Sequence, residues 1–598
     1  MGNGKKTFAK VAAMLMAATS LFSTVGCDLG GDDHSDETYI MIENFGGGVG
    51  VQWLNNAIRR FMDHIGDKQY EEGKPVVIEV VRNDTGVHCD NIQSSGSHMF
   101  FFQEPYSKLY NLIQVDAFME ITDIVRDEPL TEYGENVTIE SKMDARYRFA
   151  MQGTGNFADK YYMLPGHESM SAASYDMDLF ETKGFYLAQE GSTFDFDSTL
   201  LGRKFYYTDL AEEKTVGNDG IAGTDDDGMP TTLDEMVAMC EYIKFNGVAP
   251  FSAPGGHIDY ANHLLESLST ALAGYDQRAA VTTLSGEVDW VTGISDEELW
   301  AGTGIKRPVI ERASISMETG YKAVNQASRY YAFAFMELAQ KQGWFYDQYT
   351  NPDYNHKAAM RSFVLNGLGN YAEIASHVEG TYWYNEAESY GLFNDYKTYS
   401  GGKTIKNIGY WHMPTAIGKD TDGNGTFDAP ADVVTGTDNK REEVAINNYT
   451  SSAVINGNID DRPGNEGKVE LCKDFLQFLY TEKELKLYTA TTGVSKALMD
   501  YPIDGEVLGE LDPYQQTVMR LRDNNRVVQQ YGNNNLYRNF STAFVYSVSG
   551  PRYAPTIGTT EYSSILEVFA KRSDQNAWTM FIHLGETDGT WAEKLGQI

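Results

Sequence analysis

Hydrophobic residues along the chain follow two spacings, one typical of strands and one typical of helices, and the two alternate. Residues 39–42 are a short strand candidate, and the glycine-rich loop 46–50 follows them. The helical spacing of the next segment gathers six apolar side chains on one face: Trp53, Leu54, Ala57, Ile58, Phe61 and Met62. Residues 76–81 are then a β-branched run, which predicts a strand buried on both faces. Strand, loop, helix and strand form the unit of a mainly parallel α/β sheet.

Two later segments carry helix signals. Thr232 and Glu235 have the spacing of a capping box, and apolar residues continue at helical spacing after them. A second helix is predicted where apolar residues recur through 471–479. The sequence has no internal repeat, and its 598 residues are enough for two or more domains, each with its own core.

The N-terminal residues have the pattern of an export signal. Lys5, Lys6 and Lys10 accompany the mostly apolar, uncharged run 11–25, which is too short to cross a bilayer. The pair Gly26-Cys27 after it resembles the end of a bacterial lipoprotein signal. The resemblance implies that residues 1–26 are removed and that Cys27 carries a diacylglycerol on its sulfur. An ordinary signal peptide with an incidental cysteine is the alternative.

The segment after the signal changes in composition. Residues 27–37 are rich in glycine and aspartate, which favours a flexible tether. No later segment has the length and apolarity of a transmembrane helix. We therefore expect an extracytoplasmic protein that a lipid alone holds at the bacterial cell membrane.

Composition narrows the function classes. Hydrophobic residues make up 42% of the chain and aromatic residues 13%, which is typical of a globular protein. The formal net charge of −37 disfavours binding to nucleic acid or flat docking on anionic lipid, because both carry phosphates. Besides Cys27 the cysteines are Cys89, Cys240 and Cys472, and this odd number argues against a disulfide framework, although one bridge stays open. Cys240 and Cys472 lie in apolar helical patterns typical of buried thiols.

One loop has the ligand spacing of a calcium site. Residues 420–428 place side chains with oxygen ligands at alternate positions, and such side chains can surround a hard cation. The candidate ligands are Asp420, Asp422, Asn424 and Asp428. The bidentate glutamate of the twelfth position is missing, since Ala431 stands there. A structural Ca²⁺ is one reading and a solvated acidic turn is the other. Residues 218–228 form a second, less regular acidic loop.

Catalytic motifs are missing from the sequence. It contains no G-x-S-x-G, no H-E-x-x-H and no phosphate-binding G-x-x-x-x-G-K-[ST]. We therefore expect a protein that is not an enzyme and requires no cofactor. Paired carboxylates, as a glycoside hydrolase needs, stay open in a chain with 85 acidic residues.

Short recognisable phrases run in order over nearly the whole chain: 44–48 before a tryptophan-bearing helix, 161–165, 175–180, 232–235, 247–251, 366–367, 380–386, 475–481 and 492–494. This series resembles family 1 extracellular solute-binding proteins of the clostridial type, the carbohydrate-binding lipoproteins of ABC importers. No single phrase is specific, but the ordered series is.

The resemblance implies a two-lobed α/β clamshell of the maltose-binding type, with a carbohydrate in the cleft between the lobes. Residues 38–170 and 450–500 would form the first lobe, and 171–449 and 501–598 the second. The chain would cross between the lobes near residues 169–175 and 448–455. A sugar has an apolar face that stacks on aromatic rings and a rim of hydroxyls that needs polar anchors.

The resemblance also suggests which residues contact the sugar. Trp383 matches the family's tryptophan on the cleft side of the second lobe, with packing in that lobe's core as the alternative. Six further residues are weaker ligand-binding candidates: Glu104, Tyr106, Glu168, Ser169, Tyr260 and Trp411. For Glu168 the alternative is a solvated carboxylate at the crossing, and for Tyr260 and Trp411 it is ordinary packing.

The expected function is that of a monomeric, lipid-anchored solute-binding protein, which captures a carbohydrate, in oligosaccharide form, and delivers it to the permease subunits of an ABC transporter. A surface-anchored glycoside hydrolase and a carbohydrate-adhesion lipoprotein are the alternatives.

Overall fold

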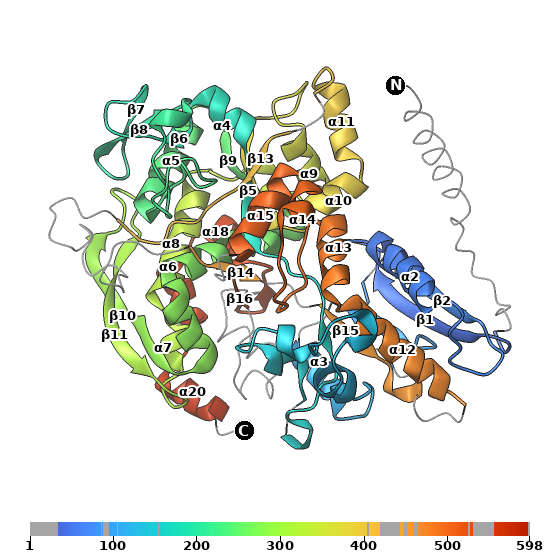
Figure 1. Cartoon of the computed structure of the whole chain (residues 1–598). Helices are drawn as coiled ribbons and strands as arrows, with labels where there is room; N and C mark the ends of the chain where they lie inside the picture. Colours follow the sequence, from blue (N-terminus) through green and yellow to red (C-terminus); the bar gives the residue numbers. More distant parts are fainter. Residues whose placement is uncertain are drawn as a thin grey trace, which may run out of the picture.

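The computed structural model describes residues 34–84, 86–87, 92, 95–103, 106–153, 155–403, 406–418, 443–447, 451–459, 464–523, 527–529 and 555–595. Two α/β lobes lie side by side, the first at the lower right of Figure 1 and the second at the upper left. Each lobe is built on its own sheet, so the predicted two-lobed α/β architecture is confirmed.

The first lobe is built on a five-stranded sheet of order β2-β1-β3-β15-β4. Its strands are β1 (Thr38–Phe45), β2 (Val76–Asn83), β3 (Met99–Phe102), β4 (Leu164–Pro165) and β15 (Ser452–Ile455). β1 runs parallel to β2 and β3, while β15 is antiparallel to β3 and β4. The helices of this lobe are α2 (Gln52–Ile65), α3 (Tyr106–Ile113), α12 (Glu466–Leu479) and α13 (Glu482–Thr492).

The predicted strand–loop–helix–strand unit is confirmed, with one difference. In α2 the predicted face is buried or partly buried, and Leu54 and Phe61 have no exposed surface. β2, however, is not buried on both faces, since its side chains are partly or fully exposed. The reason is its position at the edge of the sheet, where only β1 pairs with it. A β-branched run predicts a strand, but not its place in the sheet.

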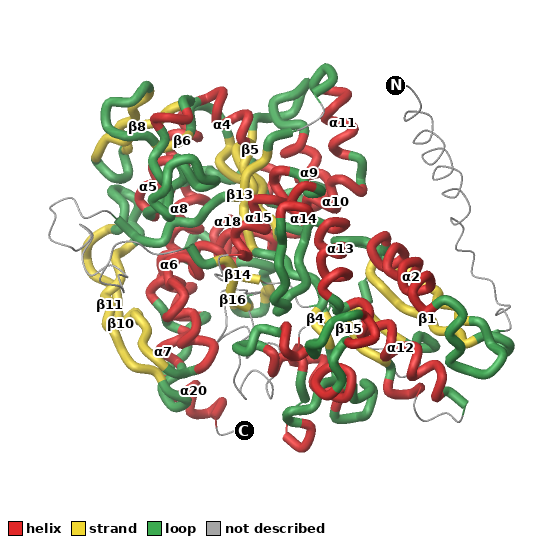
Figure 2. The backbone as a smooth tube through the Cα atoms, in the orientation of Figure 1, coloured by secondary structure: helices red, strands yellow, loops and turns green. Residues whose placement is uncertain are grey.

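The second lobe is built on a four-stranded sheet of order β13-β5-β12-β9. Its strands are β5 (Ser171–Asp176), β9 (Ala249–Ser252), β12 (Ile374–Gly380) and β13 (Ile408–Tyr410). The helices in this part of the chain are α4 (Met177–Lys183), α5 (Leu233–Phe245), α6 (Asn262–Thr283), α7 (Tyr321–Val324), α8 (Ala327–Lys341), α9 (His356–Val364), α10 (Trp383–Ser389) and α11 (Leu392–Tyr399). Figure 2 shows these helices packed around the strands.

Smaller elements extend the second lobe. The sheet β6-β8-β7 comprises Tyr186–Leu187, Arg203–Thr208 and Phe194–Ser198, and the long hairpin of β10 (Gly286–Glu298) and β11 (Lys306–Ile315) lies at the outer edge. β14 (Ala445–Asn447) pairs with β16 (Val527–Gln529), and β17 (Thr556–Ile557) with β18 (Thr560–Glu561). The remaining helices are α14 (Gly505–Gly509), α15 (Pro513–Asp523), α18 (Ile565–Lys571), α19 (Ala577–His583) and α20 (Asp588–Leu595).

The chain passes between the two sheets at segments that lie side by side. Residues 166–170 join β4 to β5, and β14 precedes β15 by four residues. The Gly166 N–H donates to the carbonyl of Ser451 over 2.7 Å. A Cβ on Gly166 would overlap Ser451, so only glycine permits this close approach. After α13 the chain returns through α14 to α15, which packs on β13 of the second sheet.

Both helices predicted from capping and apolar spacing are present. α5 begins with the capping box of Thr232 and Glu235, and its apolar side chains are buried. α12 buries Leu471, Phe475 and Leu476. Cys240 and Cys472 are buried free thiols within these helices, as predicted, and burial raises the pKa of both. Cys89 lies outside the described residues.

Candidate functional site

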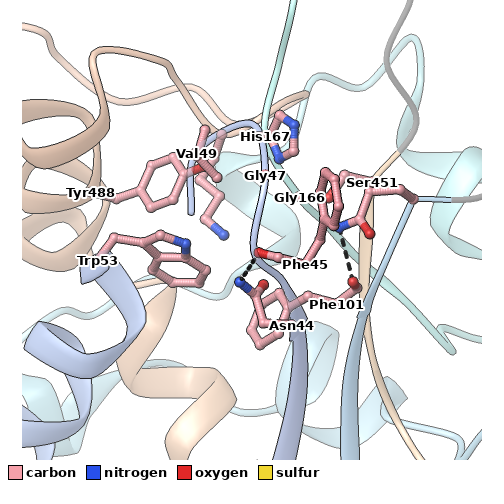
Figure 3. A pocket seen from close by; sticks show the side chains of 12 residues that line it. Asn44, Phe45, Gly47, Val49, Trp53, Phe101, Gly166, His167, Ser451 and Tyr488 are labelled. Carbon is pink, nitrogen blue, oxygen red and sulfur yellow. Dashed lines mark hydrogen bonds between the residues drawn. The ribbon is translucent and has the colours of Figure 1, made fainter. Parts of the chain in front are cut away.

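A small cavity opens in the first lobe, next to the segments that cross between the sheets. Its walls come from parts of the chain that are far apart in the sequence, and most of the lining residues are labelled in Figure 3. The lining residues are Asn44, Phe45, Gly47, Val49, Trp53, Phe101, Gln103, Gly166, His167, Ser451, Tyr488 and Lys496.

The fold explains why the cavity forms at this position. β1 and β3 are parallel, and their carboxyl ends supply Asn44, Phe45 and Phe101. Ligands in open α/β sheets bind outside the carboxyl ends of the strands. The Asn44 side-chain amide donates to the carbonyls of Phe45 (2.9 Å) and Gly50 (3.1 Å), which holds the loop from β1 to α2 beside the cavity.

The first turn of α2 also borders the cavity. Trp53 lies in that turn, and Val51, the N-cap residue, makes no side-chain capping hydrogen bond. No acidic residue stands in the first turn. The amide groups at the start of a helix carry a partial positive charge, so this wall of the cavity favours negative groups.

Aromatic rings form a cage around a buried ammonium. The Lys496 Nζ lies 4.4 Å from the ring centroid of Tyr488, 4.6 Å from that of Trp53 and 5.6 Å from that of Phe101. Tyr480 adds a fourth ring at 5.4 Å. Trp53 and Phe101 in turn pack edge to face, with ring centroids 5.3 Å apart. The cavity therefore combines flat apolar surfaces with a cation.

Burial sets the protonation of the two titratable side chains on this wall. Desolvation lowers the pKa of Lys496 to about 7. Desolvation and the nearby Lys496 lower the pKa of His167 to about 3, so the imidazole is neutral at physiological pH. His167 and Lys496 are also held together by a backbone bridge, and the Ala497 N–H donates to the Gly166 carbonyl over 2.8 Å.

The second lobe touches the loop beside this cavity. The Gly48 N–H donates to Glu386 Oε1 in α10 over 2.9 Å. The Asn385 side-chain amide of α10 also donates a hydrogen bond to the carbonyl of Thr492 in α13 over 2.6 Å. Desolvation, together with the charge of Glu379, raises the pKa of Glu386 to about 7. The lobes are thus closed on each other at this edge.

Trp383 does not lie on a cleft wall in this structure, which corrects the sequence-based assignment. The indole is fully buried, and it packs against Phe363, His377 and Tyr514. Its Nε1 donates to Ser174 Oγ over 2.8 Å. These partners all belong to the second lobe, so the ring has no surface left for a sugar.

Trp411 is also a core residue. It is fully buried, and its ring contacts Tyr175, Phe180 and Phe251 in the second lobe. This buried position agrees with the alternative given for Trp411 in the sequence analysis, which was ordinary packing. Tyr260 differs from both tryptophans because it is only partly buried. Its ring stacks on His257 and meets His263 edge to face.

Glu168 and Ser169 lie in the first crossing segment, and both are buried. Glu168 Oε2 accepts a hydrogen bond from Ser495 Oγ over 2.7 Å and lies 3.9 Å from Arg522 Nε, while burial raises the pKa of the carboxyl. The Ser169 N–H donates to Asn447 Oδ1 over 2.9 Å. Their contacts join crossing segments, so Glu168 is not the solvated carboxylate of the alternative reading.

Several predicted residues cannot be placed. Glu104, the lipidation site Cys27 and the calcium ligands Asp420, Asp422, Asn424 and Asp428 lie outside the described residues, and Tyr106 is described only as the first residue of α3.

The second acidic loop is described. Its Asp226 Oδ2 accepts from the Asn218 and Asp219 N–H groups, and Asp225 pairs with Arg520 at 2.7 Å. Within the described part of the chain, no three His, Cys, Asp or Glu side chains are grouped to hold a metal ion.

The sequence analysis missed the cavity and its cation. In the sequence, Trp53 is only one of six apolar residues on a predicted helix face. Lys496 follows the 492–494 phrase of the family resemblance by two residues, but a lone lysine carries no sequence signal. Its role depends on rings from α2, β3, α13 and the residue that follows α12, which only the fold brings together.

Comparison with known proteins gives matches among solved structures alone. No protein-family model matches the chain, and no curated protein matches it. The chain is similar to a chitin oligosaccharide binding protein at 13% identity, with a TM-score of 0.46, over 83% of this chain and 89% of that one. It is similar to maltose-bound MalE3 of T. maritima at 11% identity, with a TM-score of 0.49, over 94% and 100% of the two chains.

A third similar structure is a family 1 extracellular solute-binding protein from Bifidobacterium longum subsp. infantis. The identity is 13% and the TM-score 0.44, and the match covers 93% of this chain and 99% of that one. At these identities and scores, the similarity assigns no ligand to this chain.

Proposed function

We propose that this protein is the solute-binding component of an ABC importer and that it captures a carbohydrate between its two lobes. The observation that carries the proposal is the cavity at the carboxyl ends of β1 and β3, bordered by the crossing segments and closed by the contact of Gly48 with Glu386. A ligand in this position would lie beside the loop that Glu386 of the second lobe contacts, so its binding would be coupled to closure of the lobes.

The lining of the cavity suits a sugar ring. Trp53, Phe101 and Tyr488 offer flat apolar surfaces, and the polar side chains of Asn44 and Gln103 lie on the same walls. Sugars need this combination, because their rings have an apolar face and a polar rim. The ordered sequence phrases of the solute-binding family support the same class of ligand.

A screen of oligosaccharides by thermal shift tests this proposal. A ligand that binds only the folded protein raises its stability by about 2.7 kcal/mol at a hundredfold excess over Kd. We expect at least one oligosaccharide to raise the melting temperature of the full-length protein in detergent, with no cleavage products after incubation. Cleaved sugar would favour the hydrolase alternative, and no shift with any member would contradict carbohydrate capture.

A blocking substitution locates the site. Val49 lines the cavity and is partly exposed, so Val49→Trp should fill the space without disturbing the core. We expect it to abolish the thermal shift. Val115→Trp is the matched control, since Val115 is 55% exposed and is not among the lining residues. Equal shifts for Val49→Trp and the parent would place the sugar elsewhere.

Lipid anchoring through Cys27 belongs to the same proposal. The sequence of the first 27 residues supports it, and no described helix has the length and apolarity needed to cross a membrane. Delivery to permease subunits would then take place at the membrane surface. Cys27→Ser should release unlipidated protein or leave an unprocessed precursor, as membrane fractionation and mass measurement would detect. Normal processing with unchanged membrane retention would contradict the assignment.

A further inference from the structure

The Lys496 ammonium is the feature of the cavity that a neutral sugar does not explain. Lys496 is 2% exposed, and its Nζ has no hydrogen bond or ion pair with any residue that the structure describes. Buried charges in proteins are nearly always paired, because removing a charge from water is costly. Aromatic faces offset part of this cost, but they accept no strong hydrogen bond from an ammonium.

Two further donors point to the same ligand chemistry. The Trp53 Nε1 is buried without a hydrogen-bond partner, and Trp53 lines the cavity. The uncapped start of α2 adds backbone N–H groups on the same wall. A cation, an indole N–H and a helix start together form a site for an acceptor that carries negative charge.

We propose that this cavity binds the anionic group of an acidic carbohydrate, a carboxylate or a sulfate ester, with Lys496 as its counter-ion. This inference rests on the proposed function and adds the class of sugar to it. The ring of the sugar would contact the aromatic side chains, and the anionic oxygens would accept hydrogen bonds from Lys496 Nζ and Trp53 Nε1. No bond is formed or broken.

The surroundings of Lys496 permit this role. The titratable groups packed near it in the first lobe are His167, which is neutral, and the phenols of Tyr480 and Tyr488. Desolvation is the cause of its lowered pKa, and among the residues that the structure describes no ionised neighbour offsets the charge. Glu386 is the acid that the second lobe brings to the adjoining loop, and its carboxyl accepts from Gly48.

The test is a panel of trisaccharides in matched neutral, uronate and 6-sulfated forms, covering gluco, galacto and manno configurations. Calorimetry on the full-length protein in detergent would give each Kd at pH 6.5. We expect at least one acidic form to bind about tenfold or more tightly than its neutral counterpart, because hydrogen bonds to charged groups are strong. Comparison of the Kd values of the uronate and sulfated sugars identifies which anion the cavity binds.

Two variants separate the outcomes. Lys496→Met keeps the length of the side chain and should abolish the preference for the acidic form, while Lys483→Met, an exposed position on α13, should retain it. Lys496→Met should also melt no lower than the parent, since it removes an unpaired buried cation. A neutral form that binds as well as the acidic one, or a preference that survives in Lys496→Met, would overturn the inference alone. A panel without any binder would overturn the proposed function as well.

The pH dependence provides a second readout. The anion needs protonated Lys496, whose pKa in the empty cavity is about 7. The Kd for the acidic sugar should therefore be constant below pH 7 and weaken about tenfold per pH unit above it, until the raised pKa of the complex is reached. Titration of Glu386 would alter the binding of neutral and acidic sugars alike, so the difference between the two isolates Lys496. A difference that does not change between pH 6 and 9 would contradict the assignment.

Discussion

Trp383→Ala should lower the free energy of unfolding by about 3–5 kcal/mol, the usual cost of removing a large aromatic side chain from a core. The indole has no exposed surface and fills space between α9, β12 and α15. Without the indole, the hydroxyls of Ser174 and Tyr514 would also lose the hydrogen bond that Trp383 Nε1 donates to them. Denaturant unfolding followed by circular dichroism would measure the change.

An exposed aromatic residue serves as the control for Trp383. Tyr399 in α11 is 52% exposed, and Tyr399→Ala should change the free energy of unfolding by no more than about 0.5 kcal/mol. A Trp383→Ala variant that unfolds like the parent and yet loses sugar affinity would restore the cleft position first inferred from the sequence.

Lys406→Met should destabilise the second lobe by about 3–5 kcal/mol, because it leaves a buried carboxylate without its cation. Lys406 Nζ lies 2.6 Å from Asp176 Oδ2, and both side chains are at most 4% exposed. Asp176 also caps α4, since its Oδ1 accepts from the Leu179 N–H at 3.1 Å, and its Oδ2 accepts from Asn366 at 2.6 Å. The pair therefore fixes the helix that follows β5.

The double variant Asp176→Asn with Lys406→Met should recover most of this loss, since no unpaired charge remains. Lys204→Met is the matched control, because Lys204 pairs with Asp195 at the same 2.6 Å while both side chains are 40% exposed or more. We expect its urea midpoint to stay close to that of the parent, because exposed ion pairs contribute little to stability. Equal effects of Lys204→Met and Lys406→Met in urea unfolding would show that burial of the pair is unimportant.

The elements of the fold were largely predictable because their signals are local. The spacing of apolar residues in α2 and the capping box of α5 depend on neighbours within a few residues, and both were found where the sequence placed them. β2 shows the limit of such signals. Its β-branched residues predicted a strand, but its exposure follows from its position at the sheet edge, which depends on the other strands.

The candidate site depended on tertiary structure far more. Trp383 and Trp53 are both tryptophans near the start of a helix, and the sequence offers no way to tell the core residue from the one at a cavity. The sequence by itself determined the α/β class, the main helices and the family resemblance, because these arise from periodicity and ordered local phrases. Only the tertiary structure decided that Lys496 lies among aromatic rings beside the crossing segments, with no ion pair to any described residue, because burial and pairing are properties of residues far apart in the chain.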